Sequence, residues 1–242
     1  MAADRDPHPA DHPGPFVVVA DLGRPTLDDD QRHHLVRVLR RRPGDPLTVG
    51  DGAGRWCTAV QGAEGDLEVT GDVISTPRAR PELTIAFALV KGDKPELVVQ
   101  KLTELGIDRI IPFRADRSVV RWDDDKAARV VARLRAVAAS ATMQCHRPHL
   151  PEVADVTDLA GLLASDGPGG GVALADREGS APSLERPAIA VGPEGGWSEA
   201  EAASPGPRVA LGAHVLRAET AADTAGALLA ALRGGVVTAG GR

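Results

Sequence analysis

The chain has 242 residues, a formal net charge of −6, and 43% hydrophobic but only 2% aromatic residues. This length fits one large or two small domains, and no run of about 18 apolar residues is present, which excludes a membrane-spanning helix. The only cysteines, Cys57 and Cys145, lie far apart, which argues against a disulfide framework and makes a reducing cytoplasm the expected location.

The first third of the chain predicts a polar tail and then a compact β-rich domain. Residues 1–15 are Pro-rich and lack the apolar centre of a secretory signal, so we expect a disordered tail. From 16 to 76, short apolar runs separated by Asp-Gly and Glu-Gly turns are typical of a small barrel. The predicted strands cover 16–20, 47–49, 56–60 and 67–73, and a helix is predicted over 28–42 with Leu35, Val38 and Leu39 on its apolar face.

This predicted helix is strongly basic although the chain as a whole is acidic. Between Gln31 and Arg42 there are five arginines and no acid. Local charge matters more than net charge for docking a polyanion. A nucleic-acid contact and a solvated basic helix face are equally compatible with this pattern.

After a predicted linker at 76–81, strands and helices alternate from residue 82 to the end. Such alternation predicts a mostly parallel sheet covered by helices, hence an α/β domain. Ligands in these sheets bind beyond the carboxyl ends of the strands. The predicted strands are 83–90, 107–113, 172–174, 188–191 and 209–211, and the predicted helices are 95–105, 123–144 and 220–233.

Two glycine-rich loops follow predicted strands near the C-terminus. In the first, residues 192–196, glycines allow a ligand to approach the backbone, although a tight turn capped by Ser198 explains the same pattern. The second, residues 211–220, adds Arg217 and Glu219 before a helix for which Thr220 is the predicted N-cap. These two charged residues form either a structural pair or a cation and an acceptor at a reaction centre.

Other site chemistries are not favoured. The first glycine loop lacks the spacing and the Lys-Ser/Thr ending of a phosphate-binding loop, and it lies too near the end of the domain to be the dinucleotide fingerprint of a first strand-to-helix turn. Cys145 and His146 are neighbours on a predicted helix and diverge by about 100°, which disfavours a nucleophilic dyad. His33 and His34 lack partners at metal-ligand spacing, so no metal is expected.

Several tracts, in this order and spacing, carry a family resemblance that runs nearly end to end. They are His34–Arg40 with Pro43-Gly-Asp45, Lys91-Gly92-Asp93 with Gln100–Gly106, Gln144–Arg147 with Pro151, Gly192–Gly196, and Leu211-Gly212 with Val215-Leu-Arg217 and Glu219-Thr-Ala221. Together they resemble the SPOUT superfamily of S-adenosylmethionine-dependent RNA methyltransferases. Within it, the chain is similar to the ribosomal RNA small subunit methyltransferase E family.

The resemblance implies a 16–76 PUA-like RNA-binding barrel and an 82–242 α/β domain with a trefoil-knotted, mostly parallel sheet. It also implies a homodimer that uses S-adenosyl-L-methionine to methylate uracil N3 of one uridine in 16S rRNA of the small ribosomal subunit. Neither a membrane nor a metal is expected as a partner.

On this basis we expect residues of three roles. Arg217 and Glu219 are the predicted catalytic residues, because loss of the N3 proton places negative charge on the uracil oxygens. The predicted cofactor-binding residues are Gly192, Glu194, Gly195, Gly196, Leu211, Gly212, Val215 and Leu216. The predicted RNA-binding residues are Arg37, Arg40, Arg41, Arg42, Lys91 and Arg147.

The sequence departs from the family pattern at Met143, where many members carry Glu, and at His214, where Arg is common. Two other functions are considered. Ribose 2′-O methyltransferases of the same superfamily pair their glycine loop with an early Asn, and this chain contains no Asn. A non-catalytic RNA-binding assembly factor would keep the fold without an intact cofactor site.

Overall fold

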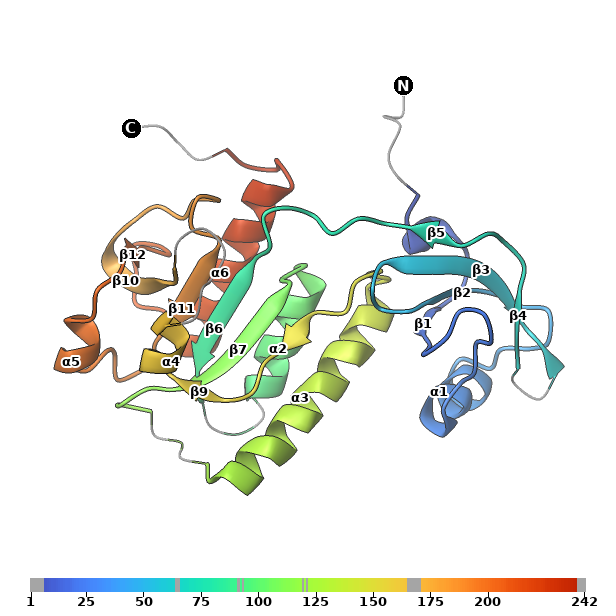
Figure 1. Cartoon of the computed structure of the whole chain (residues 1–242), viewed down its shortest axis with the longest axis horizontal. Coiled ribbons are helices and arrows are strands. Elements are labelled where there is room, and N and C mark those ends of the chain that lie inside the picture. The colour runs from blue at the N-terminus through green and yellow to red at the C-terminus, as the bar shows by residue number, and fades with distance from the viewer. Residues whose placement is uncertain are drawn as a thin grey trace. The chain divides into compact units, whose positions relative to one another are not determined.

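The computed structural model describes residues 7–63, 66–90, 92, 94–118, 120, 122–164 and 171–238. Its chain forms two compact units (Figure 1). The first comprises Met1–Arg78 with Ala139–Leu150, and the second comprises Ala79–Ala138 with Pro151–Arg242. The first unit therefore includes a segment from the middle of the chain that the sequence pattern did not indicate.

The first unit is built on a five-stranded sheet with the order β1-β2-β3-β4 and with β5 paired to β3. The β1–β2 pair is parallel and the other pairs are antiparallel. Alternate strand residues such as Val17, Leu47 and Val49 are buried in its core. The strands are β1 (Phe16–Val18), β2 (Pro46–Gly50), β3 (Arg55–Gln61), β4 (Leu67–Val69) and β5 (Ile74–Ser75). β5 was not predicted.

Part of the predicted disordered tail is ordered. Pro9–Asp11 form a 3-10 turn in which the His8 side chain accepts a hydrogen bond from the Ala10 amide, at 3.1 Å. Pro9 is buried. Residues 1–6 of the predicted tail lie outside the described residues.

The basic helix is shorter than predicted and changes its winding. Helix α1 (Asp29–His33) starts at the Asp28 capping box and continues as a π-helical turn, η2 (His34–Val38). Leu35 is buried as predicted, but Val38 and Leu39 are 58% and 43% exposed. A π turn places successive residues differently from a 3.6-residue helix, so the predicted apolar face is not maintained.

Residues 139–150 pack on the first sheet through backbone hydrogen bonds. The Gly54 amide donates to the Pro148 carbonyl at 3.0 Å, and the Leu150 amide donates to the Gly52 carbonyl at 2.8 Å. His149 is buried with its Nε2 2.8 Å from the Thr76 carbonyl. Burial lowers the pKa of His149.

The second unit contains a seven-stranded sheet with the order β12-β10-β11-β6-β7-β8, and β9 pairs with β7. Every pairing in the described part of this sheet is parallel, which confirms the predicted α/β class. The strands are β6 (Thr84–Ala88), β7 (Arg109–Arg114), β8 (Glu152–Val153), β9 (Thr157–Asp158), β10 (Ala173–Ser180), β11 (Ala188–Val191) and β12 (Arg208–Val209). The helices are α2 (Lys94–Glu104), α3 (Asp124–Gln144), α4 (Leu159–Ala164), α5 (Glu199–Ala202) and α6 (Ala218–Arg233).

Both faces of this sheet are covered, which explains the continuous apolar runs in its strands. On one face, Ile85 and Phe87 of β6 belong to a cluster with residues of α2 and α6. On the other face, Ala86 and Ala88 join a cluster that includes Leu162 of α4. The alternation of side chains along β6 therefore supplies both cores.

The end of α6 is fixed by a buried ion pair. Arg233 donates a hydrogen bond to Asp108, and its guanidinium also donates to the Gly106 carbonyl at 2.6 Å. Asp108 additionally accepts a bond from the Leu83 amide at 2.9 Å. The last helix is thus tied to the loops that flank the central strands.

Of the helices in the described part of the chain, none combines the length and apolarity needed to cross a bilayer. Cys57 and Cys145 form no disulfide. No group of three or more potential metal ligands occurs within the described residues.

Candidate active site

The two glycine loops and part of β10 line a cavity of about 680 Å³ in the second unit. Because β12, β10 and β11 are neighbours in the sheet, the loops after β11 and β12 meet at one edge. The volume lies within the range of about 300–1,000 Å³ that is typical of small-molecule pockets. All of the predicted cofactor-binding residues except Gly195 line it.

The first loop, residues 192–196, has structural reasons for its glycines. A Cβ added at Gly192 would lie 3.0 Å from the Trp197 ring. Gly196 has a φ of +69°, a conformation that L side chains rarely adopt. Trp197 is itself fixed, since its Nε1 donates to the Ala175 carbonyl at 3.0 Å and its ring stacks on Phe113.

The end of this loop is held by the segment after β7. The predicted capping box of Ser198 and Glu201 is present at the start of α5. Ser198 Oγ donates to Asp116 Oδ2 at 2.6 Å, and the Asp116 amide donates to Glu201 Oε1 at 2.9 Å. Gly195 does not line the cavity, and its carbonyl accepts a bond from Arg117 Nη1 at 3.2 Å. The loop is therefore both a tight turn and one wall of the cavity.

The second loop leads directly into α6. The helix begins at Ala218, and its N-cap is Arg217 rather than the predicted Thr220. Thr220 lies inside the first turn, where its carbonyl accepts a bond from Thr224 Oγ1 at 2.7 Å. The extra turn arises because Arg217 has an extended backbone and Ala218 is already buried against the core.

Glu219 is paired with a lysine that sequence reasoning did not assign to the site. Lys94 Nζ lies 2.9 Å from Glu219 Oε1 and 3.7 Å from Glu194 Oε1, so it connects α2, α6 and the first glycine loop. Glu219 Oε2 is buried and has no hydrogen-bond partner among the described residues. The only sequence signal for Lys94 was its place shortly after a strand end.

The pKa of Glu219 reflects two opposing effects. Burial raises it, but the hydrogen bond and charge of Lys94 outweigh this and leave the pKa below its ordinary value. The same hydrogen bond raises the pKa of Lys94. Both groups are therefore held in their charged forms near neutral pH.

Arg217 is exposed and does not line the cavity. Within the described part of the chain it forms no ion pair with Glu219, so the structural pair considered from the sequence is not present. Its positive charge nevertheless contributes to the lowered pKa of Glu219. Arg217 is thus close enough to influence the electrostatics of the site, and no described residue holds it in an ion pair.

A short polar run at β10 also lines the cavity and was missed from the sequence. Asp176, Arg177 and Glu178 come from the part of β10 beyond its buried residues. The sequence signal was an acid-Arg-acid run one residue after the apolar Val172–Leu174. These residues add polar groups to the lining of the cavity.

One further acid lies near Glu219. Asp223, one turn later on α6, has an Oδ1 atom that is buried without a hydrogen-bond partner among the described residues. Burial raises the pKa of Asp223 to about 6, and the charge of Glu219 adds to this effect.

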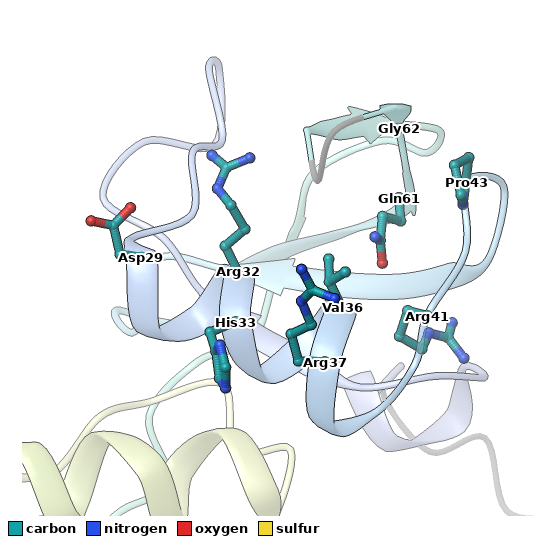
Figure 2. Close-up of a pocket in the computed structure, with 9 residues that line it drawn as sticks. All are labelled: Asp29, Arg32, His33, Val36, Arg37, Arg41, Pro43, Gln61 and Gly62. Carbon is teal, nitrogen blue, oxygen red and sulfur yellow. The ribbon is translucent and has the colours of Figure 1, made fainter.

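The predicted RNA-binding residues fall mainly in the first unit. Arg37 lies in η2, Arg40, Arg41 and Arg42 lie in the loop after it, and Arg147 follows α3. Arg37 and Arg41 line a second cavity, which Arg40 and Arg42 do not (Figure 2). Lys91 lies outside the described residues.

Comparison with known proteins places the chain in a family. Residues 77–230 match an RNA methyltransferase domain, and residues 27–71 match an RNA methyltransferase PUA domain. The chain is 33% identical over 219 residues to the ribosomal RNA small subunit methyltransferase E of Mycobacterium bovis, covering 82% of this chain and 83% of the relative. The chain belongs to the ribosomal RNA small subunit methyltransferase E family.

Other members of the methyltransferase E family agree with this assignment. Identity to the Bacillus subtilis protein is 34% over 220 residues, covering 81% of this chain and 85% of that protein. A crystal structure of the Neisseria gonorrhoeae member bound to S-adenosyl methionine superposes with a TM-score of 0.76 at 26% identity, covering 90% of this chain and 97% of the other. The family and the fold class expected from the sequence are confirmed.

Proposed function

We propose that this protein is an S-adenosylmethionine-dependent methyltransferase that modifies N3 of a uridine in 16S rRNA of the small ribosomal subunit. The main support is the cavity at the sheet edge, where both glycine loops of the family pattern lie together. The Neisseria gonorrhoeae relative, which covers most of the chain, was crystallised with the same cofactor.

The residues of the cavity fit the cofactor. A Cβ added at Gly196 or Gly212 would meet no atom within 4 Å, so the backbone at both positions is open to a ligand. Trp197, Leu211 and Leu216 supply apolar surface, and Asp176 and Glu178 supply acceptors for hydroxyl or ammonium groups. The bound cofactor would contribute an electrophilic methyl group, and the protein contributes binding, orientation and exclusion of water.

Arg217 and Glu219 have different roles in this proposal. Uracil N3 releases its proton to solvent water, and Arg217 stabilises the negative charge that this leaves on the uracil oxygens while N3 accepts the methyl group. Glu219 has a lowered pKa and is a weak base, which suits a fixed anion better than a proton acceptor. Glu219 therefore acts as a positioning residue: together with Lys94 it determines the electrostatic field at Arg217.

The arginines of the first unit supply the contact to RNA. Arg37, Arg40 and Arg42 are exposed on a domain that matches a PUA model, and each phosphate contact contributes to a salt-dependent affinity. We further propose a homodimer with a trefoil-knotted catalytic domain in the cytoplasm, on the basis of the family resemblance.

The test is incubation with methyl-labelled cofactor and small subunits that lack the modification, followed by mapping of the labelled nucleoside. We expect 3-methyluridine at one position. Label on a ribose would indicate a 2′-O methyltransferase, and no label together with no heat of cofactor binding in calorimetry would indicate a non-catalytic assembly factor. Either result would overturn the proposal.

A further inference from the structure

The first unit contains a cavity of about 430 Å³ whose lining includes Arg37, one of the proposed RNA contacts. Figure 2 shows it as a groove between the helical segment that carries Arg32, Val36 and Arg37 and the end of β3. Its lining residues are Asp29, Arg32, His33, Val36, Arg37, Arg41, Pro43, Gln61 and Gly62. We call it the arginine groove, and all of it lies within the segment 27–71 that matches the PUA model.

The arginine groove combines positive charge with apolar surface. Arg32, Arg37 and Arg41 contribute three guanidinium groups to the lining and Asp29 contributes one carboxylate. The carboxylate of Asp45, which is not a lining residue, pairs with Arg41 at 3.8 Å. Arg37 is exposed and forms no ion pair with any residue that the structure describes. Val36 and Pro43 provide apolar contacts beside these charges. A ligand that fits this lining carries an anionic group for the arginines and an apolar group that packs on Val36 and Pro43.

One buried acceptor of the groove lacks a partner. Gln61 is only 3% exposed, and its Oε1 accepts no hydrogen bond from a described residue. Arg41 is already engaged, since its Nε forms an ion pair with Asp45 Oδ2 at 3.8 Å and its Nη2 donates to the Pro46 carbonyl. Since buried polar groups are nearly always paired, the unmet acceptor of Gln61 indicates a ligand that supplies the missing donor.

We propose that the arginine groove binds one unpaired nucleotide of the RNA substrate. The arginines hold its phosphate, and Gln61 Oε1 accepts a hydrogen bond from a base N–H group or the ribose 2′-hydroxyl. An acidic peptide could also satisfy the arginines and donate a backbone N–H group, but the groove lies in a segment that matches an RNA methyltransferase PUA domain, which favours RNA. An unpaired nucleotide fits best, because its base N–H groups are available in addition to its 2′-hydroxyl. This proposal rests on the proposed function, which makes RNA the substrate.

The first test is the substitution Gln61→Met, which keeps the length of the side chain and removes the amide. We expect the KM for unmodified small subunits to rise about fivefold, since one hydrogen bond to the RNA is lost. The kcat at saturating subunits and the cofactor affinity should stay at the wild-type values. The Tm should not fall, because an unpaired buried acceptor has been removed.

The second test uses an exposed residue, so that folding is not at issue. Arg37→Ala should raise the KM and reduce the slope of log affinity against log salt by about one. Arg24→Ala is the matched control, because Arg24 is an exposed arginine of the same unit that does not line the groove. The control should leave both quantities unchanged.

The ligand class is tested by competition between a labelled oligouridylate and unlabelled probes on the wild-type protein and Gln61→Met. Oligouridylate should compete better than inorganic phosphate at equal ionic strength, and only oligouridylate should lose affinity in the variant. If phosphate competes equally well, the groove is a simple anion site and the inference is wrong. Oligodeoxyuridylate as a further competitor identifies the donor to Gln61. It should compete as well as oligouridylate if the donor is a base N–H, and less well if the donor is the 2′-hydroxyl.

Failure of this inference differs from failure of the proposed function. If the wild-type protein methylates small subunits but Gln61→Met and Arg37→Ala keep the wild-type KM, only the nucleotide groove is refuted. If the wild-type protein transfers no methyl group to RNA, the proposed function itself is wrong.

Discussion

Replacement of Asp223 by Asn should stabilise the protein, and the gain should depend on pH. Burial raises the pKa of Asp223 from 3.8 to about 6, and Oδ1 has no hydrogen-bond partner among the described residues. Because one pKa unit corresponds to about 1.4 kcal/mol, keeping this carboxylate ionised in the folded state costs at most about 3 kcal/mol. Solvent reaches part of the side chain, so about 1–2 kcal/mol is expected after screening.

The sign of the pH dependence follows from the raised pKa. Below pH 3.8 the carboxyl is protonated in both the folded and the unfolded state, and Asp223→Asn should have little effect. Between pH 3.8 and about 6 the unfolded state ionises first, so the wild type loses stability relative to the variant. Above about pH 6 the difference should be constant. Asn and Asp have similar helix propensities, so this substitution isolates the charge.

The assay is thermal and urea unfolding of both proteins from about pH 4 to pH 8. We expect the Tm of Asp223→Asn to exceed that of the wild type by about 2–8 °C near pH 8, and the two Tm values to converge near pH 4. Glu185→Gln is the control, since Glu185 is an exposed acid of the same unit. A Tm difference that is independent of pH, or a variant less stable at pH 8, would refute the argument.

Three other substitutions test the catalytic unit. Gly192→Ala places a methyl group 3.0 Å from an indole ring and should weaken cofactor binding about tenfold in calorimetry; unchanged affinity would show that the loop adapts freely. Lys94→Met removes the partner of Glu219, whose pKa should rise because the largest effect that offsets burial is lost. The acid limb of the pH–rate profile should therefore move to higher pH. An unchanged pH–rate profile would show that the Lys94–Glu219 ion pair does not affect turnover. Arg233→Met leaves Asp108 buried without its cation and should cost about 3–5 kcal/mol in urea unfolding, whereas a loss below about 1 kcal/mol would contradict a buried pair.

The sequence was informative where a local pattern determined the structure. The continuous apolar run around β6 indicated a strand buried on both faces, and the long amphipathic pattern of Asp124–Gln144 predicted α3 almost to the residue. Both glycine loops were expected after strand ends at the carboxyl edge of the sheet, where ligands bind, and both line one cavity there although β10 lies between β11 and β12. These features depend on residues close together in the chain.

Features that depend on distant residues were missed. The pairing of Lys94 with Glu219 joins two helices that are far apart in the chain, and no periodicity signals it. The return of residues 139–150 to the first unit rests on backbone hydrogen bonds to Gly52 and Gly54, which carry no side-chain pattern. The π turn of His34–Val38 was missed because propensity does not distinguish it from an ordinary helix.

Arg217 violates two local rules at once, and this supports its proposed role. It occupies the N-cap of α6 without a side-chain cap hydrogen bond, and it places a cation at the positive end of the helix dipole. Local inconsistencies of this kind concentrate at functional sites, where stability is lost in exchange for activity. A residue selected for the helix alone would be Ser, Thr, Asp or Asn.

Arg217→Ser should therefore separate stability from activity. A serine cap and the loss of the unfavourable charge should raise the free energy of unfolding by about 1 kcal/mol. Turnover should fall by about 10²-fold or more with cofactor affinity unchanged, since the group that stabilises the developing charge is gone. A variant that is more stable and still fully active would show that Arg217 has no part in methyl transfer. A variant that is less stable would show instead that Arg217 supports the fold through contacts outside the helix cap.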